Sequence, residues 1–242
     1  MAMTSHAAKW RLDGKQCLVT GGTKGIGRAI AEELCALGAH VLVCARNADD
    51  LAEMQKVFRA KGYRLDTLIA DVSAEVGRDA LLDAMRNPTQ GLGWEGGCLH
   101  VLINNVGVNI RRKTEDFTTA EYAKLMQTNL DSAFHLTRAC LPLLKAGGDA
   151  SIVMNSSVAG GPTTMRSGSV YAMTKAAMNQ LTRVLACEWA PLGIRCNAVA
   201  PWYTDTPLAL QVLENEAYRK EVLDRTPMGR TGKPEVTSIA KQ

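Results

Sequence analysis

The sequence has little of several features that mark common classes of protein. Aromatic residues make up only 5% of the chain, and no apolar run approaches the roughly 18 residues that a membrane-spanning helix requires. No block of basic residues occurs, because 28 lysines and arginines are spread along the chain against 24 acids, for a net charge of +4. We therefore expect neither a membrane nor a nucleic acid as a partner.

Patterns for metal ions and disulfides are missing as well. The seven cysteines form no C-x-x-C pair, and the four histidines show no ligand spacing. Most of the cysteines lie inside apolar stretches, which favours reduced thiols in the core. The residues before Trp10 contain neither an apolar signal core nor a long transit segment. We predict no metal and a cytoplasmic location.

What the chain does contain is a regular alternation of short apolar strands and amphipathic helices. The sequence predicts strands over residues 15–20, 40–45, 64–71, 99–104, 151–155 and 194–199, and helices over 26–37, 49–61, 74–85, 119–144 and 171–190. Strands that are nearly continuously apolar indicate a parallel sheet covered on both faces. The expectation is a single α/β domain over residues 1–242 with a Rossmann-type doubly wound parallel sheet and an N-terminal extension of about 12 residues.

The first predicted strand runs directly into a glycine-rich turn, which reads TGGTKGIG over residues 20–27. Glycine suits a turn with unusual dihedral angles, where the backbone must approach a pyrophosphate closely. The helix that follows directs its amide groups and its positive dipole end toward that phosphate. The spacing is G-x-x-x-G-x-G rather than the general G-x-G-x-x-G pattern.

The glycine turn is the first of several motifs that together resemble the short-chain dehydrogenase/reductase family. The others are Asp71-Val72, Asn104-Asn105-Val106-Gly107, Asn129, Ser156-Ser157, Tyr171-x-x-x-Lys175 and residues 197–201. The similarity covers residues 10–235, and the segments LACEWA at 185–190 and PWY at 201–203 resemble plant tropinone-reductase-like enzymes. The resemblance implies an oxidoreductase acting on CH–OH and C=O groups.

Tyr171 and Lys175 lie four residues apart on one predicted helix, so their side chains leave the same face. A nearby ammonium favours the phenolate, and we expect it to lower the pKa of Tyr171 from about 10 toward neutrality. Ser157 follows the fifth strand and is expected to polarise the substrate oxygen. It lies 14 residues before Tyr171, whereas the family usually has 13, so Ser156 remains an alternative. The resemblance implies that Asn129 holds a water that connects Lys175 to solvent.

The second predicted strand ends in Cys44-Ala45-Arg46-Asn47, without an acidic residue that would bind the ribose 2′-hydroxyl of NAD. Arg46 and Lys24 are suited to neutralise a 2′-phosphate, so the predicted cofactor is NADPH/NADP. With the motifs that match the family, the expected cofactor site comprises Gly21, Thr23, Lys24, Gly25, Ile26, Gly27, Arg46, Asp71, Val72, Asn104, Gly107, Tyr171, Lys175, Pro201, Thr204 and Thr206.

The substrate is expected at the far end of this site. Residues 201–230 resemble the substrate lid of the family, in which apolar groups close over the carbonyl and exclude water. The expected substrate residues are Ser157, Trp202, Tyr203, Leu208 and Arg111. An arginine at this end repels a cationic amine, so we expect neutral or anionic ketones to be preferred over tropinone.

The chain ends soon after Gly232-Lys233-Pro234, where the family usually continues with a helix and a seventh strand. We expect that helix and strand to be missing, which exposes an edge strand. The two long helices could still form a homodimer.

The leading hypothesis is an NADPH-dependent carbonyl reductase for a small-molecule ketone or alcohol. The alternatives are a 3-oxoacyl-carrier or steroid-type reductase of the same family, and a catalytically weak NADPH-binding or interaction protein.

Overall fold

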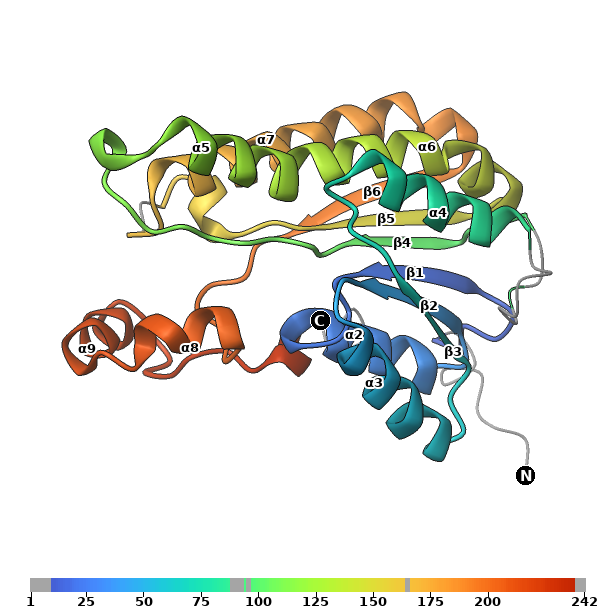
Figure 1. The fold of residues 1–242 in the computed structure, drawn as a ribbon, viewed down its shortest axis with the longest axis horizontal. Coiled ribbons are helices and arrows are strands. Elements are labelled where there is room, and N and C mark those ends of the chain that lie inside the picture. The colour runs from blue at the N-terminus through green and yellow to red at the C-terminus, as the bar shows by residue number, and fades with distance from the viewer. Residues whose placement is uncertain (1–9, 88–93, 95–96, 164–165, 238–242) are drawn as a thin grey trace.

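The computed structural model describes residues 10–87, 94, 97–163 and 166–237, which form one α/β unit around a single sheet (Figure 1). The strands are β1 (Gln16–Thr20), β2 (His40–Ala45), β3 (Leu65–Ile69), β4 (Val101–Asn104), β5 (Ala150–Asn155) and β6 (Ile194–Val199). All neighbours pair in parallel, in the order β3-β2-β1-β4-β5-β6. This order is the doubly wound Rossmann-type arrangement, so the predicted fold class is confirmed.

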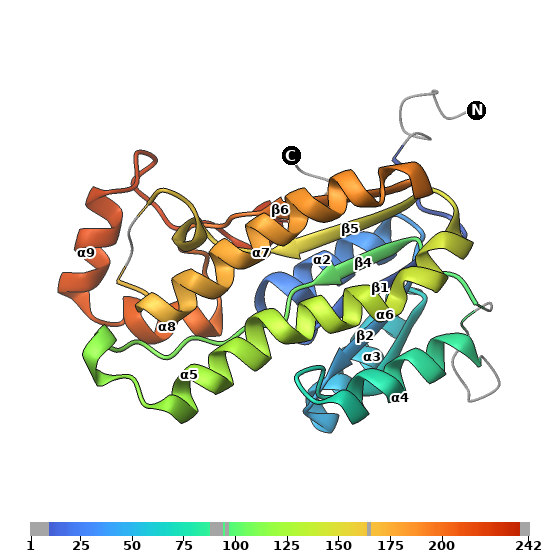
Figure 2. The same cartoon turned by 90° about the horizontal axis from the view of Figure 1, so that it is seen from above.

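Helices cover both faces of the sheet (Figures 1 and 2). On one face lie α2 (Gly25–Ala36) and α3 (Ala48–Ala60), and on the other lie α4 (Glu75–Arg86), α6 (Ser132–Gly147) and α7 (Ser169–Glu188). Each strand contributes side chains to the hydrophobic packing on both faces of the sheet, because successive side chains point to opposite faces. In β1, Cys17 and Val19 pack with the residues of α2 and α3, whereas Leu18 packs with those of α4, α6 and α7.

The predicted helix over residues 119–144 is not regular throughout. It consists of α5 (Thr119–Met126), a π-helical segment (Gln127–Asp131) and α6. A capping box between Thr118 and Glu121 starts α5. The prediction of one uninterrupted α-helix is therefore wrong in its middle. π-helical turns often occur at functional positions, and this one carries Asn129.

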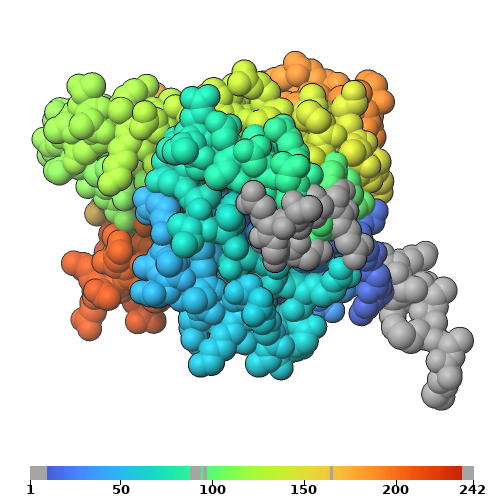
Figure 3. Space-filling view, turned by 45° about the vertical axis from the view of Figure 1, so that its right-hand side comes forward, coloured from blue at the N-terminus to red at the C-terminus, as the bar shows by residue number. Residues whose placement is uncertain are grey.

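After β6 the chain leaves the sheet and forms α8 (Pro207–Leu213) and α9 (Glu216–Asp224), which project from the body of the molecule in Figure 1. Figure 3 shows this segment in orange-red, at one end of the molecule and below the residues around α5. Tyr203, Leu213 and Val222 form a small core of their own. The segment is joined back to itself by an isolated bridge between Thr204 and Gly232.

The remaining described elements are four short 3₁₀ turns, Thr114–Asp116, Val158–Gly160, Ala190–Leu192 and Pro234–Thr237. The last of these contacts α2. The part of the chain that the structure describes contains no seventh strand, so β6 is the edge of the sheet there. None of its helices has both the length and the apolar character that crossing a membrane would require.

Candidate active site

A cavity of about 410 Å³ opens at the carboxyl ends of the strands, where doubly wound sheets bind their ligands. The structure brings nearly all of the predicted site residues together around it: Gly21, Thr23, Lys24, Gly25, Ile26, Gly27, Arg46, Asp71, Val72, Gly107, Arg111, Ser157, Tyr171, Lys175, Pro201, Trp202, Tyr203, Thr204, Thr206 and Leu208. Asn104 and Asn129 are the two predicted residues that do not line it.

The glycine turn forms one wall of the cavity, and its shape depends on missing side chains. Gly25 has a φ of 55°, in the left-handed region that side chains disfavour, and a Cβ there would lie 3.0 Å from Thr206 Cγ2. A Cβ on Gly27 would lie 2.4 Å from Asn105 Nδ2 and 2.5 Å from the Gly21 carbonyl oxygen. The helix α2 begins at this turn without a side-chain cap or an acidic residue in its first turn. Its first amide groups are therefore not satisfied by a capping side chain.

Asn105, not Asn104, supports the glycine turn. Its Nδ2 donates hydrogen bonds to the carbonyl oxygens of Thr20 at 2.9 Å and Gly21 at 3.0 Å. The side chain of Asn104 is buried and donates to Thr137 Oγ1 at 2.9 Å, on the side of α6. The expectation that Asn104 lines the cofactor site is wrong in this structure, because neighbouring residues leave a strand in opposite directions.

A second asparagine connects this support to the predicted catalytic lysine. Asn155, at the end of β5, donates from Nδ2 to Asn105 Oδ1 at 2.7 Å. Its carbonyl oxygen accepts a hydrogen bond from Lys175 Nζ, also at 2.7 Å. A single chain of contacts thus runs from the glycine turn through two amides to the lysine. Changes in the turn and in the position of Lys175 are therefore physically linked.

Lys175 lies deep in the molecule, with only 3% of its surface exposed. Burial disfavours the ammonium and lowers the pKa of Lys175 to about 8. Its Nζ lies 5.7 Å from the centre of the Tyr171 ring. The two side chains are neighbours on α7, as their spacing predicted.

Tyr171 faces the cavity and receives a hydrogen bond from Ser157. Burial raises the pKa of Tyr171, and the hydrogen bond from Ser157 and the charge of Arg111 only partly oppose this effect. The expectation that Lys175 brings the pKa of this phenol below 10 is therefore wrong for the protein alone. At neutral pH the side chain is a neutral phenol, which is the form that donates a proton.

The two serines after β5 have different surroundings. Ser156 donates from Oγ to the Lys175 carbonyl oxygen at 3.1 Å, so its hydroxyl is used by the backbone of α7. Ser157 Oγ accepts from the Ala159 amide at 3.1 Å and is the serine that contacts the phenol. The extra residue between Ser157 and Tyr171 does not prevent this contact.

Asn129 is completely buried and does not reach the cavity surface. Its Oδ1 accepts from the Val108 amide at 2.8 Å, and its Nδ2 donates to the Val108 carbonyl at 2.9 Å. The side chain therefore fastens the segment after β4 to the π-helical turn. A Cβ on Gly107 would lie 3.5 Å from Lys175 Nζ and 3.6 Å from Asn129 Oδ1, so both groups approach the same face of Gly107.

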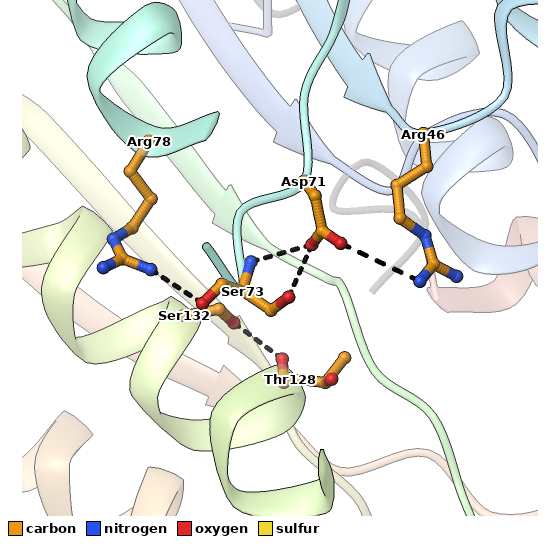
Figure 4. A network of polar contacts seen from close by, with 6 residues as sticks. All are labelled: Arg46, Asp71, Ser73, Arg78, Thr128 and Ser132. Atoms are coloured by element: carbon orange, nitrogen blue, oxygen red, sulfur yellow. Dashed lines mark hydrogen bonds and ion pairs between the residues drawn. The ribbon is translucent and has the colours of Figure 1, made fainter. Parts of the chain in front are cut away.

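Arg46 and Lys24 are the two cations that were predicted to bind a 2′-phosphate. Both line one end of the cavity, and each of them lies near an acidic side chain. Figure 4 shows Arg46 and Asp71 facing each other, with 4.0 Å between Arg46 Nη1 and Asp71 Oδ2. Burial raises the pKa of Asp71, but hydrogen bonds from Ser73 and the charge of Arg46 outweigh it and keep the carboxylate charged. Lys24 is more closely paired, at 2.7 Å from Asp50. Arg46, 69% exposed and loosely paired, is thus the freer of the two cations.

The opposite end of the cavity is lined by aromatic and aliphatic groups of the 201–230 segment. Trp202, Tyr203 and Leu208 all contribute to its wall. Trp202 is fixed by a hydrogen bond from Nε1 to Thr226 Oγ1 at 2.9 Å and by Arg225, whose guanidinium lies 5.7 Å from the centre of the indole ring. Arg111 lines the same end.

Sequence reasoning missed several residues around the cavity. The most important are Asn105 and Asn155, which hold the turn and the lysine, and Asp50, which pairs with Lys24. Ser167, at the substrate end, was missed too. Only Asn105 could have been found from the sequence. It directly follows Asn104 at the end of a strand, and consecutive side chains of a strand point to opposite faces of the sheet. Within the described ranges, no group of three or more His, Cys, Asp or Glu side chains could hold a metal ion.

Comparisons with known proteins show which family the chain resembles. A model of the short chain dehydrogenase family matches residues 15–217. A tropinone reductase homolog of Arabidopsis thaliana is 47% identical over 230 residues, which are 95% of this chain and 84% of the relative. A second homolog from that plant, described as chloroplastic, is 46% identical over 240 residues, or 99% of this chain and 72% of the relative.

Among solved structures, a gluconate 5-dehydrogenase from Burkholderia cenocepacia in complex with NADP and tartrate superposes with a TM-score of 0.86. It is 30% identical and covers 95% of this chain and 87% of its own. The region that the family model matches, residues 15–217, contains the glycine turn, both serines, Tyr171 and Lys175. The chain is therefore an oxidoreductase that belongs to the short-chain dehydrogenase/reductase family.

Proposed function

We propose that the protein is an NADPH-dependent carbonyl reductase that reduces a small ketone, with Tyr171 as the proton donor. The observation that carries this proposal is the position of Tyr171. Its phenol contacts Ser157 and faces the same cavity as the glycine turn, with the buried Lys175 beside it. An acid, a polarising hydroxyl and a phosphate-binding turn around one cavity support a reduction chemistry.

The residues present fit NADPH. The backbone of the glycine turn leaves room that a Cβ at Gly25 or Gly27 would fill, and the uncapped start of α2 suits a pyrophosphate. Arg46 is free to turn from Asp71 toward a 2′-phosphate, whereas Lys24 must first leave Asp50. When bound, the nicotinamide supplies a hydride to the carbonyl carbon. NADP in several related structures, such as the Burkholderia enzyme, supports the same cofactor here.

The chain's own groups would then act on the carbonyl oxygen. Ser157 donates a hydrogen bond that stabilises the negative charge developing there. Tyr171 gives up its proton to the same oxygen, and its raised pKa keeps the proton in place until that charge appears. We propose that Asn129 and Lys175, which both approach Gly107, belong to the path that returns a proton to Tyr171. Pro201 and the lid residues Trp202, Tyr203 and Leu208 would exclude water.

The direct test is NADPH oxidation by the purified protein with a panel of cyclic, steroidal and thioester-linked ketones. We expect turnover of a small ketone by the wild type and a loss of about 100-fold or more in Tyr171→Phe. NADPH binding should change little in that variant, because only a hydroxyl is removed. Full activity of Tyr171→Phe would refute the proposal.

The same panel separates the alternatives. A steroid or an acyl thioester as the best substrate would favour the other reductases of the family, and cofactor binding without turnover of any ketone would favour an interaction protein. The 47% identity to the tropinone reductase homolog supports the small ketone. Tropinone itself should be a poorer substrate than uncharged cyclic ketones, because Arg111 lies at the substrate end.

We further propose a homodimer formed through the outer faces of α6 and α7. Phe134 on α6 is 43% exposed, and Met173 and Val184 on α7 are 52% and 40% exposed. Large apolar side chains on adjacent long helices support an interface there.

We also propose a cytoplasmic location, which imaging of a fluorescent fusion in its native cells would test. Enrichment of the fusion in a membrane-bound compartment would contradict it.

A further inference from the structure

At the substrate end of the cavity, three polar atoms are buried but bind nothing in the described part of the chain. These atoms are Asn109 Oδ1, Arg111 Nε and Ser167 Oγ. Their residues line the cavity that Tyr171 faces, and Ser167 is only 4% exposed. Buried polar groups without partners are unfavourable and uncommon. Three of them along one stretch of a cavity point to a ligand that completes their hydrogen bonds.

The two segments that carry these atoms are packed firmly against each other. A Cβ on Gly168 would lie 3.2 Å from the Ile110 carbonyl oxygen and 3.5 Å from that of Arg112. Thr114 Oγ1 also donates to Ser169 Oγ at 3.1 Å. The backbone that carries Ser167 therefore rests on the backbone that carries Arg111. A ligand would meet a prepared site rather than two separate loops.

The charge of Arg111 lacks a counter-charge among the described residues. Its neighbour Arg112 is paired with Glu121 at 2.6 Å, and Arg166, across the lid, is paired with Glu221 at 3.1 Å. Among the described residues, the buried Nε of Arg111 has no hydrogen-bond partner, and neither of these two acids pairs with its guanidinium. Burial raises the pKa of both Tyr171 and Tyr203, and the positive charge of Arg111 opposes this effect at both phenols.

We propose that Arg111 and Ser167 bind a carboxylate on the substrate, so that the enzyme acts on a small oxo acid. This rests on the proposed reductase function and assigns its substrate class. A guanidinium fits a carboxylate with two parallel hydrogen bonds, and the Ser167 hydroxyl adds a third donor. Asn109 Oδ1, an acceptor in the same cluster, disfavours a ligand with acceptors on every side, such as phosphate. It suits a carboxylic acid that also carries a hydroxyl group.

The test compares acids with their uncharged esters: 3-oxobutanoate and 4-oxopentanoate against the two methyl esters, with NADPH. We expect the better acid to exceed its ester by about 10- to 100-fold in kcat/KM, the range of a charge-assisted hydrogen-bonded pair. Arg111→Met should remove this preference by lowering kcat/KM for the acid toward that for its ester. Ser167→Ala should lower turnover of the acid by about 3- to 10-fold, as for a neutral donor. Arg112→Met is the matched control, since it removes the same charge from the next residue, and should leave the preference intact.

Binding gives a second readout that does not depend on turnover. Calorimetry with 3-hydroxybutanoate should show binding to the wild type and about 10-fold weaker binding to Arg111→Met, with weaker binding of inorganic phosphate to both. Equal kcat/KM for acid and ester, or equal losses for both in Arg111→Met, would overturn the carboxylate site while leaving the reductase intact. If no ketone is turned over, the reductase proposal fails, and the calorimetry alone decides whether Arg111 binds a carboxylate.

Discussion

Lys175→Met should make the protein more stable and less active at the same time. The native lysine is 3% exposed, and burial lowers its pKa from 10.5 to about 8. That difference corresponds to about 3 kcal/mol by which burying the ammonium disfavours the folded state at neutral pH. Methionine has nearly the same length and no charge, so it removes this cost with little change in packing.

Part of the gain is lost because the Asn155 carbonyl oxygen loses its 2.7 Å hydrogen bond from Nζ. Such a bond contributes about 1 kcal/mol net. We therefore expect Lys175→Met to be about 2 kcal/mol more stable than the wild type near pH 7. For a chain of 242 residues this is an increase in Tm of about 4–8 °C.

The pH dependence gives the reasoning a sharper test. Between pH 8 and pH 10.5 the unfolded lysine binds a proton that the folded one has lost, so the wild type gains stability as the pH rises through this range. Below pH 8 both states are protonated and the full cost remains. The stability advantage of Lys175→Met should thus be greatest below pH 8 and should shrink toward pH 10.5.

Urea denaturation followed by circular dichroism, at several pH values from 7 to 10, measures this advantage. Lys56→Met is the matched control, because Lys56 is exposed on α3 and its replacement should change little. We also expect kcat of Lys175→Met to fall by about 100-fold or more. The reasoning would be refuted if Lys175→Met were less stable than the wild type at pH 7, or if the difference did not change with pH.

Three further predictions concern other parts of the molecule. Arg46→Met should raise KM for NADPH by about 10-fold or more and hardly change KM for NADH, since it removes a charge-assisted contact to the 2′-phosphate; equal effects in cofactor kinetics would exclude that role. Gly27→Ala should lower the free energy of unfolding by about 1–3 kcal/mol, because its Cβ would lie 2.4 Å from Asn105 Nδ2. Gly161→Ala, whose nearest contact is 3.4 Å away, is the control, and equal denaturation midpoints for the two variants would contradict the packing argument. Phe134→Glu should convert a dimer to a monomer in analytical ultracentrifugation, and an unchanged mass would argue against the α6 and α7 interface.

The elements of the sheet could be predicted closely from the sequence because most of their residues are apolar and because they end in clear turns. The predicted bounds of β2 and β6, residues 40–45 and 194–199, are those of the structure. The π-helical turn around Asn129 was not predictable, since the same apolar spacing suits a regular helix and the wider turn coincides with a tertiary contact to Val108. The sequence at the start of α8 does carry a typical signal for the start of a helix. Thr206 caps it and Pro207 follows, which is a typical first turn.

At the site, the sequence identified the residues that carry family motifs but not their surroundings. Tyr171, Lys175 and Ser157 do meet at one cavity. The effect of burial on Tyr171 outweighs the charges around it, and no sequence pattern gives the depth of a side chain. The pairing of Lys24 with Asp50 joins the glycine turn to the first turn of α3, so it exists only after folding. The burial of Tyr171 and the Lys24–Asp50 ion pair both depend on residues far apart in the sequence. The periodicity of a segment therefore cannot predict them.

The unfavourable features of the free protein lie together around Tyr171. Lys175 holds a buried charge, and the charge of Arg111 has no counter-ion among the described residues. Either cost could be removed by an uncharged side chain, so neither is explained by stability. Both become favourable when negative charge enters the cavity, as phosphate groups near the glycine turn, as an oxyanion at Ser157 or as a substrate carboxylate. Lys175 and Arg111 are therefore positive groups that the fold alone does not need, which is consistent with a site that binds an anionic reaction partner. Replacing Lys175 and replacing Arg111 should each weaken a different one of these interactions.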